Sequence, residues 1–200
     1  MQRIGILGGT FNPPHKGHTY IAWEAKRLAN LDRMIFIPCY VPPHKEVHGG
    51  VSAKQRFDMT RIATADVPEF EISDIEIKKG GTSYTAETLE KLKELYPDDT
   101  LCFVVGGDSL QGMETWYHPE RIFALADIIA FARDDMDREK LFEFREYYKN
   151  KYGARIEVID VAPVDVSSSQ IRDLIAEGKG VGDLVAPAVM EYIEKNGIFK

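Results

Sequence analysis

The 200-residue sequence predicts an α/β fold, a doubly wound and mostly parallel sheet with helices on both faces. Two observations predict it. Short apolar runs of strand length alternate with segments whose apolar residues recur at helical spacing, and this alternation indicates parallel βαβ units. No internal repeat, low-complexity tract or linker-like shift in composition interrupts the alternation. In sheets of this kind ligands bind beyond the carboxyl ends of the strands, so the loops after strands are the places to look for function.

The expected strands are short apolar runs bounded by turn-forming or polar residues. They cover residues 4–7, 34–38, 70–77, 101–105, 128–132 and 156–161.

The expected helices lie between and after these strands. The segment 54–65 is preceded by Ser52, which stands three residues before Gln55 as in a capping box. The segment 85–96 stops at Pro97, which disfavours helix continuation. The full set is 19–29, 54–65, 85–96, 139–149, 168–177 and 188–195.

Length and composition suit a single domain over residues 1–200, with the C-terminal helical part from about 166 to 200. The net charge of −7 argues against a nucleic-acid partner, because phosphate neutralisation needs a basic surface. No apolar run reaches the length of a membrane span and the chain starts without a signal-peptide pattern. Cys39 and Cys102 form no CxxC motif, which favours a reduced compartment. We therefore expect a cytoplasmic protein without a membrane partner, and a homo-oligomer stays open.

The first predicted strand ends in a loop rich in glycine and histidine. Gly8 and Gly9 let the main chain approach a ligand closely, and N–H groups at the following helix start attract anions. His15 and His18, three residues apart, can both face a phosphate there. Neither the dinucleotide-binding GxGxxG pattern nor GxxxxGK[ST] is present, so a phosphate site would be of another kind.

Other interpretations of this loop remain open from the residues alone. A Gly-Gly pair is often only a turn, and a lone histidine is often a surface or capping residue. A zinc site from Cys39, His44 and His48, or from His15 and His18, lacks a fourth ligand at structural-zinc spacing.

The segment "GGTFNPPHKGH" resembles the first motif of the bacterial nicotinate-nucleotide adenylyltransferases, which belong to the HxGH nucleotidyltransferase superfamily. "VSSSQIR", residues 166–172, is similar to the second superfamily motif, ISSTxIR. The segments "VPPHK", "GTSYTAETL", "VVGGDSL", "TWY" and "VAPAVMEYIEKNGIF" extend the resemblance from Arg3 to about Phe199. The resemblance implies a Rossmann-like nucleotidyltransferase fold.

The resemblance also implies a reaction: ATP and nicotinate mononucleotide give deamido-NAD and pyrophosphate, a step of NAD biosynthesis. The nucleophile is a phosphate oxygen that is mostly ionised at pH 7, so no general base is needed. Catalysis would come from positioning two anions and stabilising developing charge. Mg²⁺ is expected to arrive with ATP, and no protein residue is assigned to it.

Site residues follow from the matched motifs. The resemblance assigns catalysis to His15, His18 and Arg172. It assigns ATP binding to Gly8, Gly9, Thr10, Phe11, Gly106, Asp108, Ser168 and Ser169. It assigns mononucleotide binding to Lys45, His44, Thr85, Trp116, Tyr117 and Arg133.

Each of these residue types also has a plainer interpretation. Serine is favoured as a helix N-cap, although three serines followed by Arg172 favour a phosphate cradle. Asp108 could cap a helix, Lys45 could be a solvated loop residue, and Trp116 could belong to the core.

Three departures from the family pattern bear on these assignments. Asn12 stands where the family usually has Asp, and Ser169 where it has Thr. The Pro-Gly turn that often follows Arg133 is replaced by "DDMD", which weakens the role assigned to Arg133.

Alternative functions remain. The amidated mononucleotide NMN could be preferred or accepted as well, although main-chain N–H groups at Thr85 favour a carboxylate. Phosphopantetheine adenylyltransferases are typically shorter and lack the Thr85 and Trp116–Tyr117 features. A non-catalytic nucleotide sensor would be expected to lose His18 or Arg172, and both are present.

Overall fold

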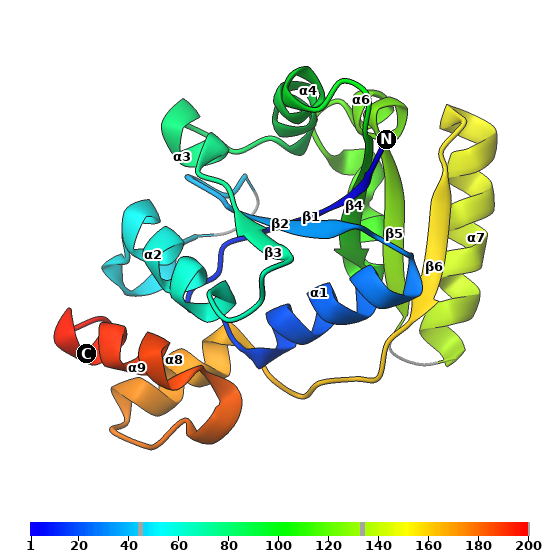
Figure 1. The fold of residues 1–200 in the computed structure, drawn as a ribbon. Coiled ribbons are helices and arrows are strands. Elements are labelled where there is room, and N and C mark those ends of the chain that lie inside the picture. The colour runs from blue at the N-terminus through cyan, green and yellow to red at the C-terminus, as the bar shows by residue number, and fades with distance from the viewer. Residues whose placement is uncertain (44–45, 133–134, 200) are drawn as a thin grey trace. The chain divides into compact units, whose positions relative to one another are not determined.

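The computed structural model describes residues 1–43, 46–132 and 135–199 (Figure 1). Six strands form a sheet in the order β3-β2-β1-β4-β5-β6, the order of doubly wound nucleotide-binding sheets. Its β1·β4, β4·β5 and β5·β6 pairs are parallel. The predicted α/β class is confirmed. The strands are β1 (Arg3–Gly9), β2 (Arg33–Pro38), β3 (Phe70–Ile72), β4 (Thr100–Gly106), β5 (Ala126–Ala132) and β6 (Ile156–Asp160).

Helices connect and follow the strands. Within the described ranges, none of them combines the length and the apolar composition needed to cross a membrane. They are α1 (Lys16–Leu28), α2 (Ala53–Thr64), α3 (Ile75–Lys79), α4 (Thr85–Leu95), α5 (Gly107–Gly112), α6 (Pro119–Leu125), α7 (Asp135–Tyr152), α8 (Ser168–Ala176) and α9 (Pro187–Lys195). Single 3₁₀ turns lie at η1 (His48–Gly50), η2 (Met113–Thr115) and η3 (Gly182–Leu184).

The chain divides into two compact units, and β1 and β2 each begin in the first and end in the second. The first unit consists of Met1–Leu7, Ala22–Ile35 and Tyr84–Pro163. The second unit consists of Gly8–Ile21, Phe36–Ser83 and Val164–Lys200.

The core of the first unit is built around β4 and β5. Their paired residues, such as Val104 and Ile129, are buried. Such nearly continuous apolar strands are typical of parallel sheets covered by helices. Helix α7 lies along β6 and also contacts β5 (Figure 1).

The core of the second unit joins α2, α8 and α9. Met59, Ile171, Val189 and Ile193 are each fully buried in one apolar cluster. The predicted capping box starts α2: Ser52 Oγ accepts from the Gln55 N–H, and Gln55 Oε1 accepts from the Ser52 N–H. This core holds α8, the helix of the second motif, in the same unit as the loop after β1.

One predicted strand is wrong in its second half. The strand expected at 70–77 ends at Ile72, and Ile75–Lys79 forms α3. The segment was expected to be a strand as part of a short apolar run, but its second half is helical and Glu76 within it is buried. Gly80, at φ +70°, ends the short helix in a backbone conformation that glycine adopts readily.

The other differences are at helix ends and in short helices. Helices α5 and α6, of six and seven residues, were not predicted. Helix α1 begins at Lys16 and α7 at Asp135, earlier than the expected starts at 19 and 139.

Candidate active site

The loop after β1 in the second unit contains a bulky residue in a left-handed conformation. Phe11 has φ +49° and is 2% exposed. Its ring meets the His18 ring edge-on at 4.9 Å between centroids and lies 5.9 Å from the Phe36 ring. A Cβ at Gly9 would come within 3.0 Å of this ring, so the glycine makes room for it. Positive φ at a large side chain costs roughly 1–3 kcal/mol and is concentrated at functional loops.

The two histidines of the first motif lie against each other. Their ring centroids are 3.7 Å apart, and the His15 main-chain N–H donates to His18 Nδ1 at 3.1 Å. Because Nδ1 accepts, the proton of neutral His18 is on Nε2. A Cβ at Gly17 would lie 2.9 Å from Val166 Cγ1 and 3.0 Å from His15 Nδ1. The glycine between the histidines therefore lets the second motif and the His15 ring approach the start of α1.

His15 is neutral at physiological pH in the absence of substrate. Burial lowers its pKa to about 4. Its Nδ1 is buried and has no hydrogen-bond partner within the described part of the chain. A nearby anion favours the protonated form of an imidazole, so bound phosphate would raise this pKa again. The ring is thus a polar group whose partner a ligand can supply.

The second motif contacts the main chain of the first. Ser168 Oγ donates to the Pro13 carbonyl at 2.8 Å, and Arg172 Nη1 donates to the Asn12 carbonyl at 3.0 Å. The serine that caps α8 is Ser167, whose side chain accepts from the Gln170 N–H. Ser169 is exposed. The structure therefore brings Ser168 and Arg172 to the loop that leads to His15 and His18.

Asn12 uses its amide group in a way that aspartate could not. The side chain is 4% exposed, and Nδ2 donates to the His48 carbonyl at 2.8 Å. A carboxylate has no proton to donate to a carbonyl at neutral pH. Its Oδ1 is buried without a hydrogen-bond partner among residues 1–43, 46–132 and 135–199. Asn12, which replaces the usual Asp of the family pattern, thus makes a hydrogen bond to η1.

In the first unit, the end of β4 leads directly into α5. Gly106 is the N-cap residue, and a Cβ there would lie 3.1 Å from the Phe131 ring. Asp108 is exposed in the first turn of α5, after the cap position. Its carboxylate is therefore not the N-cap group.

Aromatic side chains gather at the start of α4 in the same unit. Thr85 is the first residue of α4, and its neighbour Tyr84 packs its ring 4.4 Å from the Tyr117 ring. Tyr117 is 45% exposed, and the His118 ring meets it edge-on at 4.2 Å between centroids. Trp116 is half-buried and lies edge-on to Phe103 at 6.2 Å, so it is not a fully buried core residue. Because Tyr84 directly precedes Thr85, its contact with Tyr117 places the start of α4 next to the Tyr117 ring.

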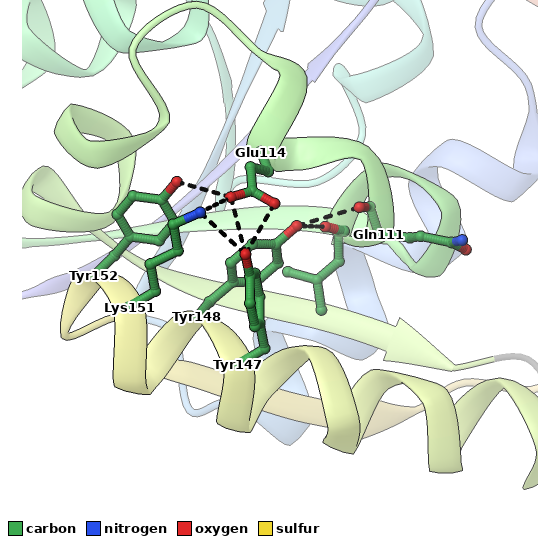
Figure 2. Close-up of polar contacts among 7 residues, drawn as sticks. Gln111, Glu114, Tyr147, Tyr148, Lys151 and Tyr152 are labelled. Atoms are coloured by element: carbon green, nitrogen blue, oxygen red, sulfur yellow. Dashed lines mark hydrogen bonds and ion pairs between the residues drawn. The ribbon is translucent and has the colours of Figure 1, made fainter.

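A polar cluster connects η2 with α7 just before Trp116 (Figure 2). Glu114, in η2, accepts hydrogen bonds from Tyr147 Oη at 3.0 Å, from Tyr152 Oη at 3.2 Å and from the Lys151 ammonium. The Lys151 hydrogen bond holds the pKa of the Glu114 carboxyl below its usual range. The Trp116 N–H donates to the carbonyl of Met113, so the aromatic pair continues directly from this turn.

A buried tyrosine on the same helix holds α5. Tyr148 Oη donates to the carbonyls of Leu110 and Gln111 at 3.0 and 3.2 Å (Figure 2). One helix, α7, therefore supports both the segment after Asp108 and the turn before Trp116.

Arg56 was not predicted to belong to the site. It is 1% exposed in α2 and donates from Nη1 to the Thr10 carbonyl at 2.9 Å and from Nη2 to the Tyr40 carbonyl at 2.8 Å. Nη1 also contacts Cys39 Sγ at 3.6 Å. Burial raises the pKa of the Cys39 thiol despite the guanidinium beside it, so Cys39 is a neutral thiol. Because the oxygen acceptors of Arg56 are main-chain carbonyls, no sequence pattern could have indicated them.

Three predicted residues, His44, Lys45 and Arg133, lie outside the described residues. Within the described ranges, no three His, Cys, Asp or Glu side chains lie together in a group that could hold a metal ion.

Comparison with known proteins places the chain among nucleotidyltransferases. The profile of the cytidylyltransferase-like family matches residues 6–174. The chain is 40% identical over 198 residues to the probable nicotinate-nucleotide adenylyltransferase of Carboxydothermus hydrogenoformans, covering 99% of this chain and 98% of the relative. It is 38% identical over 199 residues to the protein of the same name from Clostridium acetobutylicum, covering 100% of both.

Solved structures show a similar fold at low sequence identity. The nicotinic acid mononucleotide adenylyltransferase of Plasmodium falciparum complexed with NaAD superposes with a TM-score of 0.78 at 19% identity. That alignment covers 100% of this chain and 98% of the other.

Proposed function

The chain belongs to the cytidylyltransferase-like family and, within it, to the nicotinate-nucleotide adenylyltransferases, and we propose that the loop after β1 and α8 perform its adenylyl transfer. The reaction converts ATP and nicotinate mononucleotide into deamido-NAD and pyrophosphate, a step of NAD biosynthesis. The observation that best supports this assignment of the site is the joining of the two motifs. Ser168 and Arg172 hydrogen-bond to the carbonyls of the loop that leads to His15 and His18.

The reaction itself needs charge stabilisation rather than a base. A phosphate oxygen of the mononucleotide attacks the α-phosphorus of ATP, a new P–O bond forms, and the bond to the bridging oxygen breaks. Both electrons of that bond leave with pyrophosphate. His15 and His18 would donate hydrogen bonds to the transferring and leaving phosphates, and Arg172 would bind the β- and γ-phosphates. Gly8, Gly9, Thr10 and Phe11 would contribute close main-chain contacts.

His18 suits this role because its Nδ1 already accepts from the His15 N–H. The Nε2–H is therefore the donor that the ring can offer without changing tautomer. His15 begins neutral, with a pKa of about 4, and gains affinity for a proton as negative charge arrives. Stabilisation by these rings would therefore increase as charge accumulates on the phosphates.

The first unit would supply the remaining contacts. Asp108 would accept hydrogen bonds from the hydroxyls of the adenosine ribose, because its exposed carboxylate is not used as a helix cap. N–H groups at the start of α4 near Thr85 would receive the nicotinate carboxylate, since α4 has no side-chain cap. The pyridine ring would stack on Trp116 and Tyr117. We assign His44, Lys45 and Arg133 to the mononucleotide from the motif match alone.

The remaining properties follow from this assignment. Mg²⁺ would enter as the MgATP substrate, neutralising the β- and γ-phosphates. Residues 1–200 would act as one catalytic domain whose segment 166–200 carries the second phosphate motif. We propose a cytoplasmic location, where the nucleotide substrates are made and used.

Pyrophosphate release tests the function. With MgATP, nicotinate mononucleotide, NMN and phosphopantetheine are compared at equal concentration. We expect a large preference for nicotinate mononucleotide. Equal rates with NMN would contradict the carboxylate site at α4 and leave the reaction class intact. Turnover only with phosphopantetheine would contradict the assignment of the first unit's aromatic residues.

A further inference from the structure

We propose that Arg56 is a positioning residue for adenylyl transfer: it orients the peptide between Thr10 and Phe11 so that the Phe11 N–H faces the phosphate being transferred. The inference rests on the proposed function of the loop after β1. It concerns a side chain of α2 that no motif of the sequence indicated.

The contacts of Arg56 are with the chain segments that leave two adjacent strands. Thr10 follows β1 and Tyr40 follows β2, and each offers its carbonyl to a different nitrogen of the same guanidinium, at 2.9 and 2.8 Å. The planar fork of arginine can bind both carbonyls at a fixed separation, whereas a lysine ammonium cannot reproduce this geometry. Arg56 therefore holds the Thr10 and Tyr40 carbonyls at a fixed position relative to each other.

Peptide geometry transmits this restraint to the Phe11 N–H. A trans peptide is planar, and its C=O and N–H bonds point in opposite directions. When the Thr10 carbonyl points to Arg56, the Phe11 N–H points away from it. Within the described residues this N–H donates to no protein acceptor. Phe11 also has a positive φ, and its ring contacts His18. The residue that carries the unpaired donor is thus also the one whose ring contacts the proposed catalytic histidine.

The arrangement is costly if Arg56 serves stability alone. Its Nε is buried with no hydrogen-bond partner within residues 1–43, 46–132 and 135–199, and an unpaired buried donor destabilises a fold. The oxygen acceptors of its guanidinium are the main-chain carbonyls of Thr10 and Tyr40. A role in orienting the peptide between Thr10 and Phe11 explains why an arginine is buried at this position.

The test uses Arg56→Lys, with Arg61→Lys on the exposed side of the same helix as the matched control. At saturating substrates we expect Arg56→Lys to lose on the order of 10²-fold in kcat, the size of effect that a small misplacement of a reacting group produces. We expect both KM values to stay within about threefold, because the donor acts mainly on charge that develops in the transition state. The control should keep the parent kcat. An unchanged kcat in folded Arg56→Lys would overturn the proposal, and so would a loss confined to KM.

A second measurement does not depend on the folding of a variant. In the ¹H–¹⁵N spectrum of the unmodified protein, the Phe11 amide should move strongly downfield when a non-hydrolysable ATP analogue is added with Mg²⁺. A Phe11 signal that does not respond to the analogue would contradict the proposal. If the protein releases no pyrophosphate with any acceptor, the proposed function fails, and the amide response still shows whether the Phe11 N–H binds a phosphate. The same titration of Arg56→Lys then tests the role of Arg56, because a response equal to that of the parent protein would overturn the proposal.

Discussion

The loop after β1 in the second unit and the aromatic residues after α5 in the first are held in place by different kinds of contact. In the loop, side chains from α2 and α8 bind main-chain carbonyls: Arg56 binds Thr10, Arg172 binds Asn12 and Ser168 binds Pro13. In the aromatic region, side chains contact one another. The Tyr117 ring contacts the rings of Tyr84 and His118, and Glu114 is held by side chains of α7.

The difference matches what each region is proposed to bind. A phosphate is recognised through the direction of N–H groups, and fixing a carbonyl fixes the N–H of the same peptide. A flat pyridine ring is recognised through faces and edges, which packed side chains provide. Changes in the loop should therefore reduce kcat, and changes in the aromatic region should raise the KM of one substrate.

The largest expected effect is that of His18→Ala. The substitution removes the ring that accepts from the His15 N–H and lies against Phe11, and with it the Nε2 donor. We expect kcat to fall by about 10²–10³-fold, as for loss of one transition-state donor, with a cooperative thermal transition retained. Lys16→Ala is the control, since Lys16 makes an exposed ion pair with Asp183. Pyrophosphate release near the parent rate in His18→Ala would remove the catalytic role of this ring.

The aromatic region is tested by Trp116→Ala. Loss of one stacking surface should raise the KM for nicotinate mononucleotide by about 3–10-fold and leave the KM for ATP unchanged. Trp23→Ala removes a partly exposed tryptophan of α1 and serves as the control. Equal changes in both KM values would show that Trp116 supports the fold rather than the pyridine site.

The motif residues of the loop after β1 could be recognised from the sequence, whereas the side chain of α2 that holds this loop in place could not. His15, His18 and Arg172 stand in two short motifs that can be recognised from the sequence alone, and their roles in catalysis stay predictions. The class of fold was predicted for a related reason, since buried parallel strands are short continuous apolar runs. The capping box could be predicted because Ser52 and Gln55 are only three residues apart, and the structure confirms it.

The parts that could not be predicted depend on contacts distant in sequence. Arg56 binds carbonyls 46 and 16 residues away, and any residue type could provide them. Glu114 meets Tyr147 and Tyr152 across 33 and 38 residues. The false second half of the strand at 70–77 has the opposite cause: a local apolar run indicated a strand, whereas Ile75–Lys79 forms the short helix α3 with Glu76 buried.

Acid should destabilise the second unit through His15. Its pKa is about 4 in the folded chain and 6.5 in the unfolded chain, so between these values only the unfolded state binds the proton. Above pH 6.5 the ring is neutral in both states and does not reduce the free energy of unfolding. As the pH falls from 6.5 toward 4, protonation of the unfolded state progressively lowers that free energy. The expected slope is at most about 1.4 kcal/mol per pH unit. Urea unfolding at pH 7 and pH 5 measures it, and His15→Gln should have a flatter dependence. Parallel curves for the two proteins would show that His15 is not the titrating group.

The smallest expected effect is that of Glu114→Gln, and it separates the two regions most sharply. The amide keeps the size of the side chain and removes the charge that Lys151 neutralises (Figure 2). Exposed ion pairs contribute little, so the KM for nicotinate mononucleotide should rise less than about fivefold, with kcat and the KM for ATP unchanged. Glu143→Gln, an exposed change on α7, is the matched control.

The pKa of Glu114 is lowered in the folded chain, so its contribution to stability is lost only as the pH falls through that lowered pKa. The Glu114→Gln variant should therefore lack this acid-dependent loss of stability. A fall in kcat instead of a rise in KM would mean that the turn before Trp116 acts on the transferring phosphate, and the division of roles between the two regions would fail.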